Sequence, residues 1–209
     1  MGEWELPVAR AALLLVELQN DIVHASKIGA KGVGGVLAAQ VQTRGVLAKV
    51  RGLCDAAHAA SVPVGYINYA RKLDFPRPRT RLHRLAGAVP TLIEGTWGAE
   101  THADVAPAAQ DHVFTRCVGT DGSYGTQLYP VMRMLGRDVL VICGVSTTLA
   151  IEGLVRGSVN RGFECVVVED CCAAYPPAWH EFSITNTLPL LATVTTASAV
   201  SAAFAAERT

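Results

Sequence analysis

The chain has 209 residues, of which 50% are hydrophobic and 17% charged, so it can bury the core of one ordinary domain. Its 18 lysines and arginines balance 18 aspartates and glutamates, which argues against nucleic acid or an anionic membrane as a partner. No apolar run approaches the about 18 residues of a membrane span. The acidic residues Glu3 and Glu5 before the first apolar run are unlike a signal peptide.

Apolar runs and helical patterns alternate along the whole chain. Strands are expected at 11–18, 62–69, 112–116, 139–143, 165–168 and 192–195. Helices are expected at 36–60, at 126–135, from 146 onward, from 177 to about 186 and at the C-terminus, with a glycine-rich loop at 24–35. This alternation predicts an α/β fold, a three-layer, doubly wound, six-stranded and mostly parallel sheet, as a single domain over residues 1–209.

The six cysteines show no paired spacing of the kind that binds a metal. Cys171 and Cys172 are adjacent, and the other four are scattered among apolar residues. This usage is typical of buried thiols that serve as small hydrophobic side chains in a reducing compartment. We therefore expect a cytoplasmic protein.

Residues 139–152 hold the clearest candidate for a functional site. An apolar run that ends at Gly144 predicts a strand buried on both faces. Ser146, Thr147 and Thr148 then offer hydroxyls that cap the following helix. Such a turn directs backbone N–H groups to one point at the carboxyl edge of the sheet, where negative charge is favoured. The alternative is an ordinary strand–helix unit.

Residues 71–84 form a basic stretch with seven basic residues, His83 included, and a single acid, Asp74. It is either a loop over the sheet edge, a subunit contact, or a solvated charged loop, and we favour the last. Aromatic and basic residues available for a contact between subunits are Trp97, Phe75, Arg77 and Arg79. We expect a homodimer or homotetramer.

Three stretches together resemble the isochorismatase-like hydrolase superfamily, also called cysteine hydrolases. They are 14–22 (Leu-Leu-Val-Glu-Leu-Gln-Asn-Asp-Ile), 113–116 (Val-Phe-Thr-Arg) followed by Gly125-Thr126, and 144–152 (Gly-Val-Ser-Thr-Thr-Leu-Ala-Ile-Glu). Similar text occurs at 95–100 and 169–171, so the resemblance spans about residues 10 to 196. It implies a non-proline cis peptide bond between Val145 and Ser146, and substrate-binding roles for Gln19, Ser146, Thr147, Leu149 and Trp97.

The chain departs from this family at the three catalytic positions. Where family hydrolases carry Asp, Lys and Cys, the matching positions hold Glu17, Arg116 and Ala150. Ala150 has no nucleophile, which closes the thioester route at that position. Arg116 stays protonated and can bind an anion, whereas Glu17 keeps a carboxylate on a longer arm that still permits acid–base work.

Other residues are weaker candidates for a nucleophile or a metal site. Cys143 is expected in the core, Cys117 on the side of its strand away from Arg116, and the hydroxyls at 146–148 as helix caps. The metal-binding amidases of the family have an Asp and His cluster after the second strand, where this chain brings mostly cations. We expect neither a metal nor another cofactor.

The sequence leaves several functions open. In the first, the chain is a hydrolase of a small, anionic substrate, with Glu17 as general acid or base, Arg116 binding substrate charge and the N–H groups of 146–150 stabilising negative charge. The bond that is hydrolysed is of amide, ureide or vinyl-ether type. Isochorismatases also lack the cysteine, and they need no covalent intermediate because water attacks a protonated vinyl ether directly. The alternatives are an inactive member that binds a small acid or assembles with other subunits, and an ordinary amidase with misaligned residues. Glu17 and Arg116 can also pair as a structural ion pair.

Overall fold

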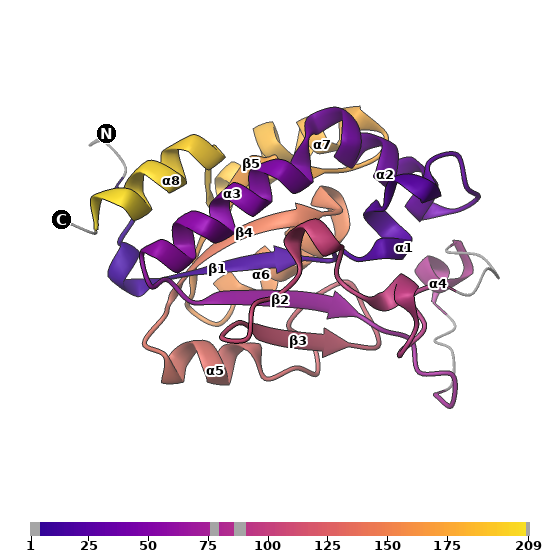
Figure 1. The fold of residues 1–209 in the computed structure, drawn as a ribbon, viewed down its shortest axis with the longest axis horizontal. Coiled ribbons are helices and arrows are strands. Elements are labelled where there is room, and N and C mark those ends of the chain that lie inside the picture. Colours follow the sequence, from indigo (N-terminus) through magenta and orange to yellow (C-terminus); the bar gives the residue numbers. More distant parts are fainter. Residues whose placement is uncertain (1–4, 76–79, 86–90, 208–209) are drawn as a thin grey trace.

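The computed structural model describes residues 5–75, 80–85 and 91–207 of the chain. Its centre is a six-stranded sheet in the order β3-β2-β1-β4-β5-β6 (Figure 1). The strands are β1 (Ala11–Val16), β2 (Val64–Tyr69), β3 (His112–Arg116), β4 (Val139–Val145), β5 (Glu164–Ala173) and β6 (Thr193–Thr195). All neighbouring strands pair in parallel, which confirms the expected α/β sheet.

Helices cover both faces of this sheet. They are α1 (Asn20–Val23), α2 (Val33–Arg44), α3 (Val46–Ala59), α4 (Arg81–Leu85), α5 (Leu128–Met134), α6 (Glu152–Val159), α7 (Pro177–Phe182) and α8 (Ala197–Ala206). In Figure 1, α2, α3 and α8 lie above the sheet, whereas α5 lies below it. Within the described ranges, no helix is long and apolar enough to cross a membrane.

The side chains of β1 alternate between two hydrophobic cores, as the geometry of a strand requires. Leu13 and Leu15 pack in the core that α2, α3 and α8 close with residues such as Val50 and Phe204. Leu14 and Val16 pack in the opposite core, together with residues of α5 and α6. Every residue of β1 is buried, so the apolar run predicts a strand covered on both faces correctly.

The helix expected at 36–60 and the strand expected at 165–168 differ from the structure. The single helix expected at 36–60 is broken at Gly45, whose φ of 63° is left-handed and ends α2 before α3 begins. The strand expected at 165–168 continues to Ala173, because Cys171, Cys172 and Ala173 are buried and their strand still pairs with β4. The polar pair Glu169 and Asp170 therefore lies within β5 instead of ending it.

The chain reverses its direction of winding between β1 and β4, and this point determines where a ligand can bind. From β1 the chain proceeds outward to β2 and β3, and from β4 it proceeds outward to β5 and β6 on the other side. Ligands of open α/β sheets bind outside the carboxyl ends of the strands at this switch point. Gly144 permits the close approach there, since a Cβ at its position would lie 2.2 Å from the Val16 carbonyl oxygen.

Candidate active site

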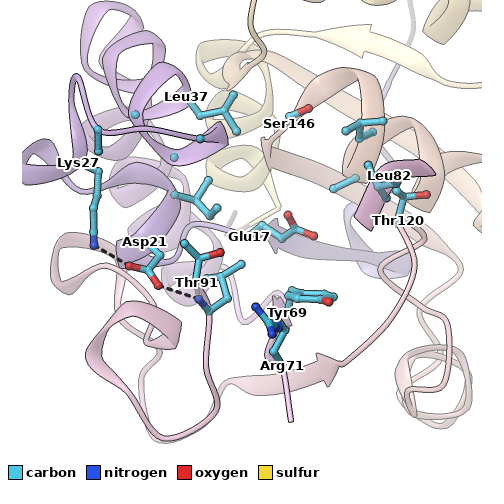
Figure 2. Close-up of a pocket in the computed structure, with 18 of the residues that line it drawn as sticks. Glu17, Asp21, Lys27, Leu37, Tyr69, Arg71, Leu82, Thr91, Thr120 and Ser146 are labelled. Atoms are coloured by element: carbon cyan, nitrogen blue, oxygen red, sulfur yellow. Dashed lines mark hydrogen bonds and ion pairs between the residues drawn. The ribbon is translucent and has the colours of Figure 1, made fainter. Parts of the chain in front are cut away.

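A cavity of about 260 Å³ lies at this switch point (Figure 2). Of the residues predicted from the sequence, five line it: Glu17, Arg116, Ser146, Leu149 and Ala150. Further parts of the wall come from α1, the glycine-rich loop before α2, the chain after β2 and the turn after β3. The structure thus brings Glu17, Arg116 and Ala150, which match the family's catalytic positions, to one cavity, although they are far apart in the sequence.

Glu17 and Arg116 form an ion pair inside this cavity. Glu17 directly follows β1, with a φ of 52° and its N–H donated to the Ile67 carbonyl at 2.8 Å. Arg116 ends β3, and its Nη2 donates to Glu17 Oε1. The Arg116 side chain is only 3% exposed and its guanidinium lies 5.2 Å from the centre of the Tyr69 ring. The pairing that the sequence left open is therefore present.

One nitrogen of the same guanidinium has no acceptor. Arg116 Nε lies 3.4 Å from the Gly119 carbonyl and Nη2 is used by Glu17, but the buried Nη1 has no hydrogen-bond partner among the described residues. A buried donor without a partner is costly, and such groups are concentrated where a ligand or water completes the bonding. The two N–H groups of Nη1 therefore have no acceptor among the described residues, although Glu17 compensates the charge of Arg116.

The segment after β4 presents Ser146, Leu149 and Ala150 to the cavity. The peptide bond between Val145 and Ser146 is cis, which confirms that expectation. Thr147–Ile151 is a π-helix that leads into α6, instead of the α-helix expected from 146 onward. The Leu149 N–H already donates to the Ser146 carbonyl at 3.2 Å, so it is not free for an anion. Ala150 contributes only a methyl group.

The other three predicted residues are not among those that line the cavity. Gln19 is fully buried, accepts from the Tyr69 N–H at 2.8 Å and donates to the Tyr69 and Ala99 carbonyls, so it fastens β2 to a distant loop. Thr147 Oγ1 is hydrogen-bonded to Nδ1 of His180 at 2.8 Å. Trp97 is 48% exposed and lies edge-on to a histidine, with ring centres 5.0 Å apart.

Asp21 is a wall residue that the sequence did not single out. Its carboxylate accepts from the Leu92 N–H at 2.7 Å and pairs with Lys27 at 2.7 Å (Figure 2). Gly98 leaves room for it, because a Cβ there would lie 2.1 Å from Asp21 Oδ2. The sequence contained evidence that Asp21 belongs to the site, since Asp21 follows a buried strand and Gly98 belongs to the stretch at 95–100 that resembles the family.

The thiols do not supply a replacement nucleophile at the cavity. None of the six cysteines, all within the described ranges, is among the lining residues. Cys143 is fully buried in β4, as expected, and burial raises the pKa of its thiol well above the ordinary value. Burial also raises the pKa of Cys165 and of Cys172 to about 12. The thiolate form that attacks a substrate is therefore suppressed at these positions.

A parallel sheet with a cavity at its switch point defines an α/β domain whose candidate ligand site lies outside the carboxyl ends of β1 and β4. The family model named Isochorismatase domain matches residues 11–199. The chain belongs to the isochorismatase family of hydrolases.

Among the described residues, no three side chains of the types that ligate metals gather at one point.

Two curated relatives match shorter segments. Over 71 residues the chain is 38% identical to the uncharacterized isochorismatase family protein YecD of Escherichia coli O157:H7, covering 34% of this chain and 38% of that protein. Over 78 residues it is 33% identical to the uncharacterized isochorismatase family protein YddQ of Bacillus subtilis (strain 168), covering 37% and 43%. The matched segments therefore span less than half the length of either relative.

Solved structures share the fold over nearly the whole chain. A cysteine hydrolase from Pseudomonas syringae pv. phaseolicola 1448A superposes with a TM-score of 0.80 at 21% identity, over 98% of this chain and 97% of that one. An isochorismatase family protein from Desulfovibrio vulgaris gives 0.78 at 25%, over 94% and 98%. N-carbamoylsarcosine amidase from Thermoplasma acidophilum gives 0.70 at 22%, over 90% and 96%. These similarities show that the architecture is common to the group.

Proposed function

We propose that the chain hydrolyses a small, anionic substrate without a cysteine nucleophile, and that Glu17 is its general acid or base. The observation that carries the proposal is the position of the Glu17 carboxylate on the wall of the same cavity as Ala150. Glu17 directly follows β1 at the switch point, and its side chain is 15% exposed. A carboxylate at this position can exchange a proton with a substrate or with water.

Two classes of scissile bond suit this arrangement. In an amide or ureide, Glu17 accepts a proton from water as the water attacks the carbonyl carbon, and the same proton then goes to the leaving nitrogen. In a vinyl ether, a protonated Glu17 gives its proton to the double bond, and water adds to the resulting cation and returns a proton to Glu17. The hemiketal formed in this way then breaks its bond to the ether oxygen and releases an alcohol and a carbonyl product. N-carbamoylsarcosine amidase, which shares the fold, is by its name an amidase of a carbamoyl compound, and this supports the first class.

Arg116 has two roles in this proposal. Its Nη2 holds the Glu17 carboxylate in place, which fixes the carboxylate toward the substrate. Its unpartnered Nη1 donates a hydrogen bond to an oxygen of the substrate where negative charge develops. The Leu149 N–H does not share that work, because the Ser146 carbonyl already accepts from it.

The second candidate is an inactive family member that binds a small acid. The specific observation in its favour is the Glu17–Arg116 ion pair, because two buried charges that compensate each other do not require a catalytic task. We also propose a homodimer or homotetramer that works in the cytoplasm. Exposed aromatic side chains of Phe75 and Trp97 support a contact, whereas Arg77 and Arg79 lie outside the described residues.

The test compares the parent protein with Glu17→Gln on a panel of small amides, ureides and vinyl-ether acids. The amide side chain keeps the size of Glu17 and an acceptor for Arg116 but cannot carry the proton, so turnover should fall ~10²-fold or more while ligand binding persists. Glu164→Gln is the matched control, since Glu164 is exposed at the opposite end of the sheet and should leave turnover unchanged.

The outcomes separate the two candidates. If the parent protein binds a small acid tightly but turns over no member of the panel, the inactive binder is the better description. If Glu17→Gln turns over as fast as the parent protein, Glu17 is not the acid–base residue.

A further inference from the structure

The charged residues of the cavity wall fall into two groups. The two carboxylates, Glu17 and Asp21, are each paired with a cation, Arg116 and Lys27 respectively. Arg71 and Lys31 also line the cavity, and neither has a carboxylate within 4.0 Å among the described residues. The positive charge that the wall leaves uncompensated therefore comes from Arg71 and Lys31, and not from Arg116.

Arg71 is held at the cavity by its main chain. Its N–H donates to the Leu92 carbonyl at 2.7 Å, and its own carbonyl accepts from the Glu94 N–H at 3.0 Å. The guanidinium is therefore not required to hold this segment together. Figure 2 shows the Arg71 side chain beside Tyr69 on the wall below Glu17.

Lys31 reaches the cavity from the glycine-rich loop before α2. The first turn of α2, directly after this loop, is packed closely, because a Cβ at Gly34 would lie 2.1 Å from the Asp21 carbonyl oxygen and one at Gly35 would lie 2.0 Å from the Ala30 carbonyl oxygen. Both glycines line the cavity beside Lys31. Close packing of the backbone therefore holds Lys31 at the same cavity that Arg71 lines, although Lys31 is exposed.

The rest of the wall suits the carbon skeleton of a small organic acid. Apolar side chains line it from several elements, namely Ile22, Leu37, Leu82, Leu92 and Leu149. A guanidinium presents two parallel N–H groups that match the two oxygens of a carboxylate, and an ammonium adds a charge without that geometry. A carboxylate attached to an apolar skeleton therefore satisfies both kinds of surface.

We propose that Arg71, assisted by Lys31, is the specificity-determining residue of this cavity and binds the carboxylate of a small organic acid. This proposal rests on the proposed function only in treating the cavity as the substrate site. It divides the work between two cations: Arg116 holds Glu17 at the reacting bond, and Arg71 holds the charged end of the substrate. The substrate then carries a carboxylate apart from the bond that is broken.

The test uses benzoate and benzamide as probes, because the two have nearly the same shape and differ in charge. Binding of each is measured by calorimetry to the parent protein, Arg71→Met, Lys31→Met, Arg116→Met and Lys72→Met. Lys72 is the matched control, since it is the neighbouring exposed cation and does not line the cavity. The parent protein should bind benzoate about tenfold more tightly than benzamide, the usual effect of a charge-assisted hydrogen bond.

Arg71→Met should abolish this preference by weakening benzoate about tenfold while benzamide binding is unchanged. Lys31→Met should reduce it by a smaller factor, and Lys72→Met should retain it. If Arg71→Met keeps the preference and Arg116→Met removes it, or if the parent protein shows no preference, the assignment to Arg71 is overturned. These results do not depend on turnover, so they are distinct from a failure of the Glu17→Gln test. A thermal melt of each variant checks that it is folded. If Arg71→Met does not fold, Lys31→Met tests the same subsite.

Discussion

His180 offers a test of the packing behind the cavity, through the dependence of stability on pH. His180 lies on α7 and is 4% exposed, with Nδ1 2.8 Å from Thr147 Oγ1. Its Nε2 is 3.9 Å from Glu169 Oε2, but Arg44 binds the same carboxylate oxygen at 3.1 Å and offsets its attraction for a proton. Burial, and then the charge of Arg44, lower the pKa of His180 from 6.5 to about 4.

The sign follows from which state binds the proton. Between pH 6.5 and about 4 the unfolded chain protonates this histidine and the folded protein does not. The neutral His180 therefore contributes stability that is fully present above pH 6.5 and is lost as the pH falls toward 4. Because the pKa of His180 falls from 6.5 to about 4, this contribution amounts to about 3 kcal/mol, and most of it is lost by about pH 4.5.

The assay is urea unfolding of the parent protein and of His180→Gln, at about pH 7 and about pH 4.5. Glutamine keeps a hydrogen-bonding group for Thr147 but does not titrate. Between the two pH values the free energy of unfolding of the parent protein should fall by about 2–3 kcal/mol more than that of the variant, because all other titrating groups are shared. Equal losses in the two proteins, within about 0.5 kcal/mol, would refute the reasoning.

Two further predictions concern packing and assembly. Gly98→Ala should lower the free energy of unfolding by about 1–3 kcal/mol in urea, since its Cβ would displace the Asp21 carboxylate, whereas Gly52→Ala, with open space in α3, should be neutral or stabilising. An unchanged stability of Gly98→Ala would contradict the close contact with Asp21. The mass in solution at micromolar concentration should be that of a dimer or a tetramer, and a monomer would end the proposal of a homo-oligomer.

Most of the fold follows from local patterns in the sequence. Continuous apolar runs predict buried parallel strands, and a turn of Gly144 and three hydroxyl residues predicts the carboxyl end of β4. The break at Gly45 escaped the pattern because an isolated glycine inside an Ala-rich helical stretch is often tolerated, and only its left-handed φ of 63° shows that the helix ends there. The extension of β5 escaped it because Glu169 and Asp170 interrupt the apolar run.

The candidate site was predictable only in part, for a different reason. Strand ends and the resemblance to a family place Glu17, Arg116 and Ala150 at one edge of the sheet, and the structure brings them to one cavity. Strand ends and family motifs do not predict which side chains will form hydrogen bonds or ion pairs with one another. Gln19 has the polarity of a binding residue, but its hydrogen bonds are used by the backbone of Tyr69 and Ala99. Arg71 stands in a basic stretch that resembles a solvated loop, and only the fold turns it to the cavity.

The spacing of the sheet explains why Glu17 and Arg116 act as a unit. Glu17 directly follows β1 and Arg116 ends β3, with β2 between them, so their backbones are separated by two strand spacings of about 4.8 Å each. A contact over that distance needs long side chains on both strands, and it passes over Tyr69, which pairs in register with Arg116. Removing either partner leaves the other charge buried and unpaired. The loss of turnover in Glu17→Gln therefore reflects the ion pair as a unit. The turnover of Arg116→Met has to be compared with it before part of the effect is assigned to either residue.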